Sequence, residues 1–537
     1  MKYTDNYYSY HRRETIPVQV GEIYIGGNNP IRIQSMTNTN TLDTAACIAQ
    51  CERMIANGCE LIRITTPSIE ETKSLKIIHQ SLKQKGYHIP LIADVHFNPK
   101  VAEIAAEIVE KVRINPGNYA DKKQFKQLNY TDQEYNLEIE RIAERLYPLL
   151  KICKTNGTAI RIGTNHGSLS DRIVSRYGNS PMGMAISAME YVTICNDFGF
   201  HNLVLSMKSS DTRIMVESVR CLVALLNTKG WHYPLHLGIT EAGNGEYGRI
   251  KSAGGIGALL NDGIGDTIRV SLTESPENEL PFAKILTEIN NNTPSNNNNC
   301  NNAIHYNPFA YQKRITNTIG KIGGNNRPIV ISKFSQIDSA DMHPDKIDNQ
   351  DIILASHNIN EHITTLRLLA DNSHKPLIFK KEYFESDWEK FIAHASADIA
   401  TLGLDGLIDA IWIINNNFSD EKIYDLSLNI LQACGLRYSK AEFISCPSCG
   451  RTQYNIEKVA TEVQQATAHL KGLKIGIMGC IVNGPGEMAD ADFGVVGSGK
   501  GKVTLYKGQI PIERNIDQDF AAKALVQLIQ SEGKWHN

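Results

Sequence analysis

The sequence predicts an α/β protein whose first half is a (β/α)8 TIM barrel. Over about the first 270 residues, short apolar runs typical of strands alternate with amphipathic stretches typical of helices. Such alternation predicts parallel strands with right-handed crossovers, and eight units in this length match a closed barrel. A doubly wound open sheet is the alternative, disfavoured because no G-x-G-x-x-G follows the first run. The eight runs are Ile31–Met36, Glu60–Thr66, Pro90–His96, Lys111–Gly117, Thr158–Asn165, Leu203–Ser210, Pro234–Thr240 and Thr267–Leu272.

Three segments are expected after the barrel, which takes residues 1–289. Residues 290–302 read NNNTPSNNNNCNN, a polar run with nothing to bury, and form the expected linker. Residues 303–434 form an α/β insert domain and 435–537 an α+β domain. Strands of the insert are expected at 328–333, 351–356, 376–380 and 407–414, which are too few for a second barrel. The last domain should contain a helix near 455–471, a strand at 474–478 and a hairpin of 493–496 with 502–506.

Composition excludes several function classes. The 537 residues carry a net charge of −3, so no overall basic field exists to hold nucleic acid or an anionic membrane. No run approaches the roughly 20 apolar residues of a membrane span, and the N-terminal residues lack the apolar core of a signal peptide. Eleven cysteines spread thinly over the chain are not a disulfide framework. A reducing, cytoplasmic location is therefore expected, with seven thiols in the core: Cys47, Cys51, Cys59, Cys153, Cys195, Cys221 and Cys434.

Charged and polar residues gather at the predicted C-terminal ends of the barrel strands, where TIM barrels place active residues. These residues are Arg63, Asp94, His96, Arg113, Arg161, Asn165, Lys208, Glu241, Arg269 and Ser271. Any single arginine is explained equally well by an ion pair with Asp94 or Glu241. The five cations together exceed the few acids of this rim, and arginine forks suit phosphate oxygens. We therefore expect a small polyanion, best a diphosphate. The glycine-rich Ala253–Gly257 stretch is compatible with phosphate binding or with close packing.

Three cysteines near the C-terminus have metal-ligand spacing. Cys446 and Cys449 form a C-P-x-C-G turn, and Cys480 follows 31 residues after Cys449. A zinc ribbon uses the same turn, but it would need a second Cys pair or a nearby His. Three thiolates suit a cubane iron–sulfur cluster with one iron left open. Glu487 follows a tight Asn-Gly-Pro-Gly turn and can reach that iron, so the spacing favours a cluster over zinc.

Eight stretches together resemble the (E)-4-hydroxy-3-methylbut-2-enyl diphosphate synthase family of the methylerythritol phosphate pathway. They are Gln34–Thr37, Asp94–Asn98, Arg113–Asn118, Arg161–Asn165, Ser206–Lys208, His236–Gly243, Cys446–Thr452 and Val482–Glu487. The resemblance covers the barrel and the final domain, and the segment between them is similar to the insert of the long members. It implies a two-electron reductive ring opening of 2-C-methyl-D-erythritol 2,4-cyclodiphosphate, with reduced ferredoxin or flavodoxin as electron donor and a homodimer as a possible assembly.

The resemblance also implies roles for individual residues. It makes Cys446, Cys449, Cys480 and Glu487 the ligands of a [4Fe–4S] cluster. It assigns the diphosphate to Arg63, Arg113, Arg161, Lys208 and Ser271, with Arg269 joining or buttressing them. Glu241 becomes the acid/base group near the leaving hydroxyl, and Asn483 contacts the substrate oxygen or the cluster. Asp94, His96 and Asn165 are further rim residues that are expected to help bind the substrate.

Two other function classes remain open from the residues alone. One is a zinc-ribbon binding module fused to an inactive barrel, which the near-neutral charge and the unpaired Cys480 disfavour. The other is a non-redox barrel enzyme of the pterin-synthase type, in which the cysteine domain is structural. Colour distinguishes the first, because a clustered protein is brown, and turnover without an electron donor distinguishes the second.

Overall fold

The first half of the chain is a parallel barrel. The structure is a computed structural model that describes residues 1–121, 129–291, 304–347, 351–356, 362–370, 373–481 and 484–536. Its largest sheet has the order β8-β7-β6-β5-β4-β3-β10-β9. The strands are β3 (Arg32–Met36), β4 (Leu61–Thr65), β5 (Leu91–Asp94), β6 (Lys111–Ile114), β7 (Ala159–Asn165), β8 (Leu203–Lys208), β9 (His236–Leu237) and β10 (Thr267–Ile268). A parallel bridge between Leu205 and Leu235 brings the two ends together, which confirms all eight predicted strands and excludes the open sheet.

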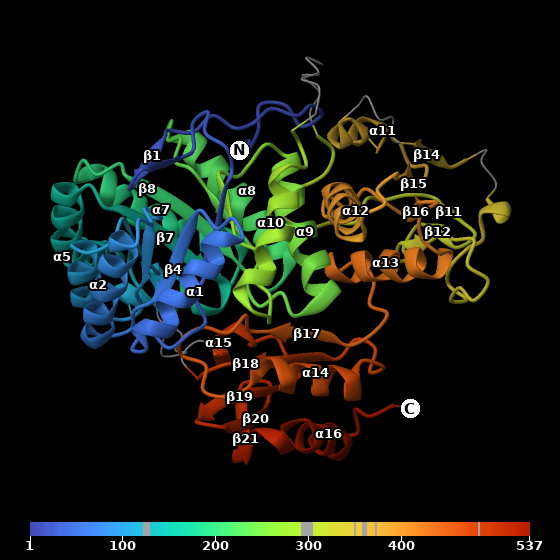
Figure 1. Ribbon diagram of the computed structural model, residues 1–537. Coiled ribbons are helices and arrows are strands. Elements are labelled where there is room, and N and C mark those ends of the chain that lie inside the picture. Colours follow the sequence, from blue (N-terminus) through green and yellow to red (C-terminus); the bar gives the residue numbers. More distant parts are fainter. Residues whose placement is uncertain are drawn as a thin grey trace.

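Helices surround this barrel (Figure 1). Each follows a strand, and polar caps fix several starts; Asp43, Ser68 and Asn98 accept hydrogen bonds from the first-turn N–H groups of three successive helices. The helices are α1 (Thr44–Ala56), α2 (Ile69–Gln84), α3 (Pro99–Ala106), α4 (Pro116–Tyr119), α5 (Asp132–Asn156), α6 (Asp171–Tyr177), α7 (Pro181–Asp197), α8 (Thr212–Thr228), α9 (Gly245–Asn261) and α10 (Glu279–Thr287). Across the described ranges, no helix is both long and apolar enough to cross a membrane.

A short hairpin closes the barrel at the N-terminal ends of its strands. The hairpin consists of β1 (Val18–Val20) and β2 (Ile23–Ile25), and the sequence analysis did not predict it. Its buried side chains pack in one cluster with Leu61, Ile92, Ala159 and Val204, which lie at or near the starts of their strands. The opposite end of the barrel therefore remains available for a site.

The insert is a smaller α/β unit. Its four parallel strands have the order β13-β16-β15-β14, which confirms the four predicted strands. They are β13 (Ile329–Val330), β14 (Ile353–Ser356), β15 (Leu377–Glu382) and β16 (Ala410–Ile414), joined by α11 (Arg367–Ala370), α12 (Trp388–Gly403) and α13 (Asp420–Ala433). A hairpin of β11 (Thr318–Ile319) and β12 (Ile322–Gly323) precedes them. Most of the Asn-rich run, from residue 292 on, lies outside the described residues.

Helix α9 of the barrel packs against α12 of the insert through small residues. A Cβ atom added at Gly257 would lie 2.3 Å from the Cβ of Ala397, and one at Gly254 would lie 3.5 Å from the Cβ of Ala400. The glycine-rich Ala253–Gly257 stretch thus lies inside a helix, away from its N-terminus. Its glycines serve helix packing, which excludes the phosphate-binding interpretation.

Four fully buried charges also join barrel and insert. Arg220 and Arg367 each lie within 2.8 Å of both Asp262 and Asp405, and none of these side chains is more than 1% exposed. Each charge is balanced by two opposite partners. Loss of one member would leave an uncompensated buried charge, which typically costs about 3–5 kcal/mol. The insert is therefore fixed against the barrel rather than tethered loosely to it.

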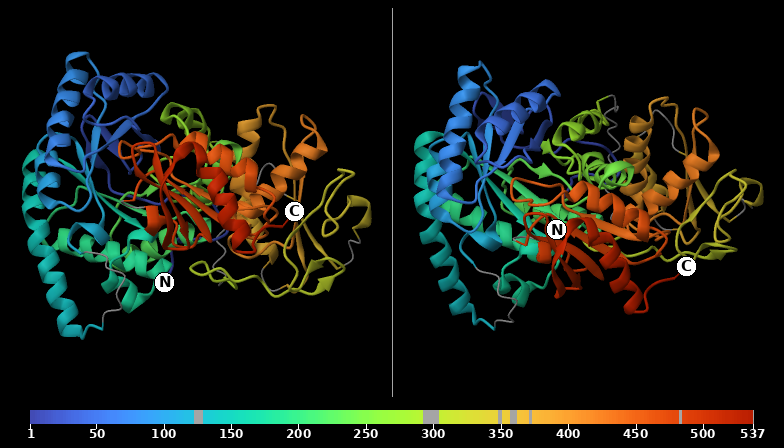
Figure 2. Two further views of the ribbon diagram at one scale, coloured as in Figure 1. Left: turned by 90° about the horizontal axis from the view of Figure 1, so that it is seen from below. Right: turned by 60° about the horizontal axis from the view of Figure 1, so that its bottom comes forward.

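A mixed five-stranded sheet forms the C-terminal part of the chain, with strands in sequence order. The strands are β17 (Glu442–Ser445), β18 (Lys474–Met478), β19 (Phe493–Gly499), β20 (Lys502–Lys507) and β21 (Ile510–Asp517), with helices α14 (Ile456–Thr467), α15 (Gly484–Glu487) and α16 (Ala521–Ser531). The predicted helix, strand and hairpin are confirmed, whereas β17, β21 and α16 were not predicted. The sheet lies below the barrel in Figure 1, and the views of Figure 2 place it across one end.

Candidate active site between the barrel mouth and the C-terminal sheet

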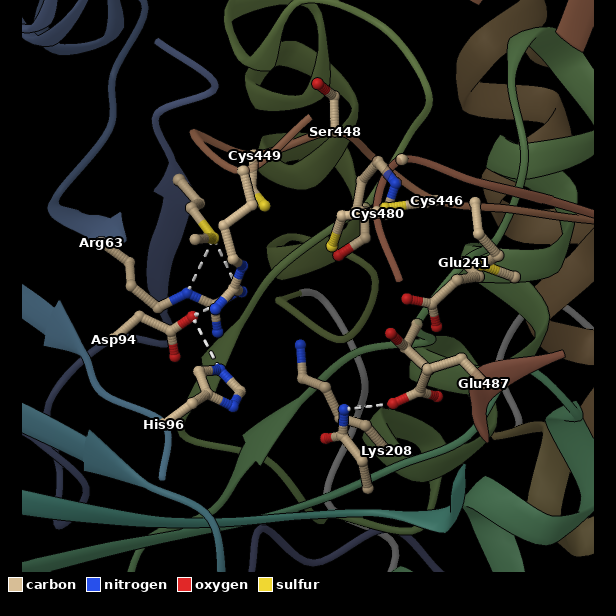
Figure 3. A pocket seen from close by; sticks show the side chains of 18 of the residues that line it. Arg63, Asp94, His96, Lys208, Glu241, Cys446, Ser448, Cys449, Cys480 and Glu487 are labelled. Atoms are coloured by element: carbon tan, nitrogen blue, oxygen red, sulfur yellow. Dashed lines mark hydrogen bonds and ion pairs between the residues drawn. The ribbon is translucent and has the colours of Figure 1, made fainter. Parts of the chain in front are cut away.

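One pocket collects the predicted site residues from both ends of the chain (Figure 3). It spans about 740 Å³ when the open solvent at its mouth is included. The barrel contributes Arg63, Asp94, His96, Arg113, Arg161, Asn165, Lys208, Glu241, Arg269 and Ser271, and the C-terminal part contributes Cys446, Cys449, Cys480 and Glu487. Asn483, the remaining predicted site residue, lies outside the described residues.

The two walls of the pocket belong to a single chain and dock closely. Ala242, which follows β9, forms a parallel bridge with Ser445 at the end of β17, and Thr273 Oγ1 donates a 3.2 Å hydrogen bond to the Ser445 carbonyl. A Cβ atom added at Gly167 would lie 2.6 Å from the Gly486 carbonyl oxygen. Glycine at this position therefore lets the backbone after β7 lie against the backbone of α15. The site is thus completed without a second copy of the chain.

Unusual backbone conformations concentrate around the pocket. Among the described residues, four non-glycine residues have a positive φ, and three are Phe97, Glu241 and Ser448. Glu241 and Ser448 line the pocket, and Phe97 follows His96. Such conformations cost of order 1–3 kcal/mol and persist where the surrounding structure imposes them, often at functional sites. The backbone therefore holds Glu241 and the Cys446–Cys449 turn in fixed orientations.

Arg113 lies at the centre of the hydrogen bonds on the barrel rim. Its Nη1 donates to Asp94 Oδ1 at 3.2 Å and its Nη2 to the Gly163 carbonyl at 3.0 Å. A Cβ atom at Gly163 would lie 2.8 Å from Arg113 Nε, so glycine makes room for the guanidinium. Burial opposes ionisation of Asp94, but Arg63, His96 and Arg113 hold the pKa of this carboxyl well below its ordinary value. One arginine of the rim is thus ion-paired, as the sequence analysis allowed.

His96 is neutral and has one N–H group free to donate. Burial lowers the pKa of His96 to about 4, although Asp94 acts in the opposite direction. Arg113 Nη1 lies 2.8 Å from His96 Nε2, and a guanidinium can only donate, so Nε2 accepts and the proton is on Nδ1. Asp94 Oδ2 lies 3.3 Å from the same Nε2, but an ion pair there would require a protonated ring. Nδ1 has no partner among the described residues, so it is available to a ligand oxygen.

Arg161 and Lys208 are buried cations that form no ion pair with an acid among the described residues. Arg161 is 1% exposed; its Nη1 donates to Ser206 Oγ at 2.9 Å, and its Nε and Nη2 have no partner in the described ranges. Burial and the neighbouring Arg63 lower the pKa of Arg161 well below its ordinary value. Burial and Arg161 do the same to Lys208. Unpaired buried donors of this kind are costly unless a ligand satisfies them.

The remaining two rim arginines share a methionine sulfur. Arg63 Nη2 donates to Met36 Sδ at 2.9 Å, and Arg269 Nη1 lies 3.6 Å from the same atom. Arg269 also pairs with buried Glu279 at 3.3 Å, which makes it a buttressed cation. Glu241 shares this pocket with two other acids, Asp94 and Glu487. A further acid, Glu279, pairs with Arg269.

Glu241 and Glu487 face each other across the domain boundary (Figure 3). Burial raises the pKa of Glu241 above its ordinary value, and the charge of Glu487 raises it further. Glu241 Oε2 is buried and has no hydrogen-bond partner among the described residues. Asn165 Nδ2 donates to Glu487 Oε1 at 2.8 Å. The arrangement favours a protonated Glu241 opposite Glu487, whose carboxyl group is oriented by Asn165.

Cys446, Cys449 and Cys480 border this pocket beside Glu487. Burial raises the pKa of Cys446 well above its ordinary value, and Cys449, Glu241 and Cys480 add to the effect. Within the described ranges, no three His, Cys, Asp or Glu side chains converge closely enough to share one metal ion. A cubane holds its ligands at separate corners, so it requires thiols around a cavity rather than at a point. The donor set and its placement around the pocket fit such a cluster.

Residues that the sequence analysis missed also line the pocket. Arg451 follows the Cys446–Cys449 turn directly, and Met36 ends β3. The position of Arg451 next to a metal-binding turn was a usable signal. No sequence signal pointed to Glu279. Its pairing with Arg269 depends on the path of the chain between β10 and α10, which the sequence does not reveal. The seven cysteines expected in the core are all buried, which confirms that interpretation.

Comparisons with known proteins agree with this arrangement. The family described as GcpE TIM-barrel domain matches residues 15–284, and the GcpE protein C-terminal domain matches residues 442–531. The chain is 44% identical to the 4-hydroxy-3-methylbut-2-en-1-yl diphosphate synthase (flavodoxin) of Phocaeicola vulgatus, over 98% of this chain and 99% of that protein. It is 42% identical to the synthase of the same name from Bacteroides thetaiotaomicron, with the same coverage.

More distant matches add little. A solved dihydropteroate synthase of Burkholderia cenocepacia is 15% identical, with a TM-score of 0.34, and covers 52% of this chain and 96% of that one. The full-length relatives carry the assignment, because their similarity spans the barrel, the insert and the C-terminal sheet. The chain belongs to the GcpE family of 4-hydroxy-3-methylbut-2-en-1-yl diphosphate synthases.

Proposed function

We propose that this enzyme reductively opens 2-C-methyl-D-erythritol 2,4-cyclodiphosphate to 4-hydroxy-3-methylbut-2-enyl diphosphate. Two electrons and one proton enter, the ring C–O bond to the diphosphate breaks, and the hydroxyl group leaves as water. The observation that carries the proposal is a single pocket lined by unpaired buried cations on one side and three thiols on the other. The cations suit a diphosphate, and the thiols suit a redox centre. Neither a zinc ribbon nor a non-redox barrel enzyme requires both.

The redox centre in this proposal is a [4Fe–4S] cluster held by Cys446, Cys449, Cys480 and Glu487. When bound, such a cluster supplies single electrons, which side chains cannot do, and offers an iron to an oxygen ligand. The side chains around it have complementary tasks. The 2.8 Å hydrogen bond from Asn165 orients Glu487, and Cys449 is the buried member of the three thiols.

The diphosphate is held by cations of the barrel rim. Arg161 offers its unpaired Nε and Nη2, and Lys208, Arg63, Arg113 and Ser271 line the same wall. His96 donates from Nδ1, and Asp94 fixes Arg113 by ion pairing. Arg269 acts as a buttress because Glu279 already pairs with it. Fixed cations stabilise the charge that develops on phosphate oxygen as the ring opens.

Glu241 is the proton donor to the leaving hydroxyl in this proposal. The side chain is 7% exposed, its backbone is held at φ 50°, and its Oε2 faces no protein partner in the described part of the chain. A carboxyl group whose pKa is raised keeps its proton near neutral pH and can deliver it. Asn483 is assigned to the substrate oxygen or the cluster by the resemblance alone.

The proposal extends to partners, location and domain boundaries. Flavodoxin appears in the names of the relatives, and we propose reduced flavodoxin or ferredoxin as the electron donor. Such carriers and free thiols suit the cytoplasm.

We divide the chain into a barrel at 1–289, a linker at 290–302, an insert at 303–434 and a cluster domain at 435–537. The barrel and cluster domains act together, and none of the described residues of the insert lines the pocket.

Turnover of the cyclic diphosphate by anaerobically purified protein, with reduced methyl viologen as the electron source, tests this function. The expected product is 4-hydroxy-3-methylbut-2-enyl diphosphate, formed with two electrons consumed per molecule. Mass spectrometry identifies the product, and the loss of viologen colour counts the electrons. Iron-loaded protein that binds the substrate but consumes no electrons would contradict the proposal. Substrate conversion without any donor would favour a non-redox barrel enzyme.

A further inference from the structure

Arg451 belongs to the C-terminal part of the chain but contacts the barrel rim. It follows the Cys446–Cys449 turn by two residues, and its Nη2 lies 3.7 Å from Asp94 Oδ2 of the barrel. The Arg451 side chain is 14% exposed and the Asp94 side chain 3%. An ion pair shielded to this degree is screened much less by salt than a surface pair. Arg451 therefore forms an electrostatic contact between the cysteine turn and the barrel.

The charge of Arg451 also acts on two of the thiols. Arg451 lies two residues after Cys449 and lines the same pocket as Cys449 and Cys480. A guanidinium in this position stabilises negative charge on those sulfurs. Arg451 Nε and Nη1 are buried and have no hydrogen-bond partner among the described residues. Two donors thus remain available in the wall of the pocket beside the cysteines.

Arg63 provides a contrast within the same pocket. It responds to the same carboxylate, since burial lowers its pKa and Asp94 opposes that effect. Arg63 lies on strand β4 of the barrel and donates to Met36 Sδ at 2.9 Å. Arg451 instead belongs to the C-terminal part of the chain and follows Cys449 by two residues.

We propose that Arg451 is a positioning residue that raises the reduction potential of the iron–sulfur cluster and that Asp94 moderates this effect. The inference rests on the proposed function, because it requires the cluster at Cys446, Cys449 and Cys480. Reduction adds one electron to the cluster, and a nearby fixed cation stabilises the added charge. Hydrogen bonds to ligand sulfurs are a recognised means of tuning such potentials. Asp94 partly neutralises the cation, so the closed arrangement of barrel and cysteine turn influences the potential.

The test is an anaerobic redox titration of substrate-free holoenzyme, followed by the electron paramagnetic resonance signal of the reduced cluster. Arg451→Gln should lower the equilibrium constant for reduction by about tenfold, which is about 59 mV for one electron. Arg451→Lys keeps the charge and should restore most of the loss. Asp94→Asn should shift the potential in the opposite direction. Arg63→Gln is the matched control, because it removes a pocket cation that lies on barrel strand β4 rather than beside the cysteine turn, and its shift should be much smaller.

A double-mutant cycle isolates the contact itself. The effect of Asp94→Asn should shrink when Arg451→Gln is also present, because the carboxylate acts through the guanidinium. Equal potentials for wild type and Arg451→Gln, or equal shifts for Arg451→Gln and Arg63→Gln, would overturn the inference. If Arg451→Gln fails to assemble a cluster, Asp94→Asn decides, because an unchanged potential in that variant would also overturn the inference. A wild-type protein without four irons per chain would instead disprove the proposed function.

Discussion

The side-chain amide of Asn165 connects the two halves of the active site. Its Nδ2 donates to Glu487 Oε1 at 2.8 Å, although the two residues are separated by 322 positions in the sequence. Its Oδ1 accepts from Arg113 Nη2 at 3.4 Å. One amide thus joins the proposed iron ligand Glu487 to an arginine of the diphosphate site. Arrival of the substrate at Arg113 can therefore influence Glu487 through a single side chain.

Substitution of Asn165 should reduce catalysis without removing the cluster. Asn165→Ala removes a hydrogen bond to a carboxylate, which is usually worth about 1.5–3 kcal/mol, so kcat/KM should fall by roughly 10- to 100-fold. Asn165→Asp should be worse, because a second carboxylate would face Glu487. Viologen-coupled kinetics and iron analysis measure both effects. An Asp variant as active as wild type would show that this contact does not matter.

Cluster content tests the proposed ligands directly. Anaerobic protein should contain about four iron and four sulfide ions per chain, as the cluster type requires. Cys446→Ser, Cys449→Ser and Cys480→Ser should each abolish the absorbance of the cluster. Cys153→Ala is the matched control, because Cys153 is fully buried in the barrel core and should leave the iron content unchanged. Zinc at one ion per chain, without iron, would refute the assignment.

Local patterns predicted most of the fold. Eight barrel strands and four insert strands were predicted because each is a short apolar run, and the barrel runs alternate with amphipathic stretches. The β1–β2 hairpin was not predicted, because its strands have three residues each, too few to show a period of two. Strand β21 was not predicted for another reason. Its first six residues are exposed, so the sequence lacks the apolar/polar alternation of a half-buried strand.

The candidate site was predicted residue by residue, but its internal pairing was not. Strand ends identified Arg113, Arg161 and Lys208, because charges are rare in buried strands. The sequence could not show that Arg113 pairs with Asp94 while Arg161 lacks an acid, since that depends on which side chains face each other across the barrel. The Ala253–Gly257 stretch was ambiguous for the same reason, because a helix interior and a phosphate loop both use small residues.

Binding of the cyclic diphosphate should take up a proton at Lys208. Burial and Arg161 lower the pKa of Lys208 well below its ordinary value in the empty pocket, and a bound anion should raise it again. Proton uptake on binding means that affinity falls as the pH rises between these two pKa values. Calorimetric titration without reductant, in buffers of different ionisation enthalpy, measures the number of protons. Lys208→Arg keeps the charge but cannot titrate in this range, so its proton uptake should vanish. Unchanged uptake in that variant would place the titrating group elsewhere.

The buried charges between barrel and insert should dominate the stability of their contact. Arg367→Met leaves Asp262 and Asp405 each with one cation fewer, so the free energy of unfolding should fall by about 3–5 kcal/mol. Urea unfolding measures this loss. Arg314→Met is the comparison, because Arg314 lies at 12% exposure and donates mainly to backbone carbonyls. Equal losses for the two variants would show that the network contributes nothing beyond ordinary arginine packing.

Glu241→Gln should separate proton delivery from substrate binding. Glutamine keeps the size of the side chain and its hydrogen-bonding capacity, but it cannot supply a proton in the same way. If Glu241 is the donor, kcat should fall by about 100-fold or more with little change in KM. Because the acid form is the active one, wild-type kcat should also decline as the pH rises through the raised pKa of Glu241, and this decline should disappear in the variant.

Arg161→Ala is the comparison for that experiment. It removes donors that the proposal gives to the diphosphate, so substrate binding should weaken by about 1.5–3 kcal/mol for each lost charge-assisted hydrogen bond. The spectrum of the cluster should survive both changes, since neither residue is among the proposed ligands. Normal turnover by Glu241→Gln would mean that the proton comes from another group. Glu241 would then act through its charge and shape alone, as the carboxyl opposite Glu487.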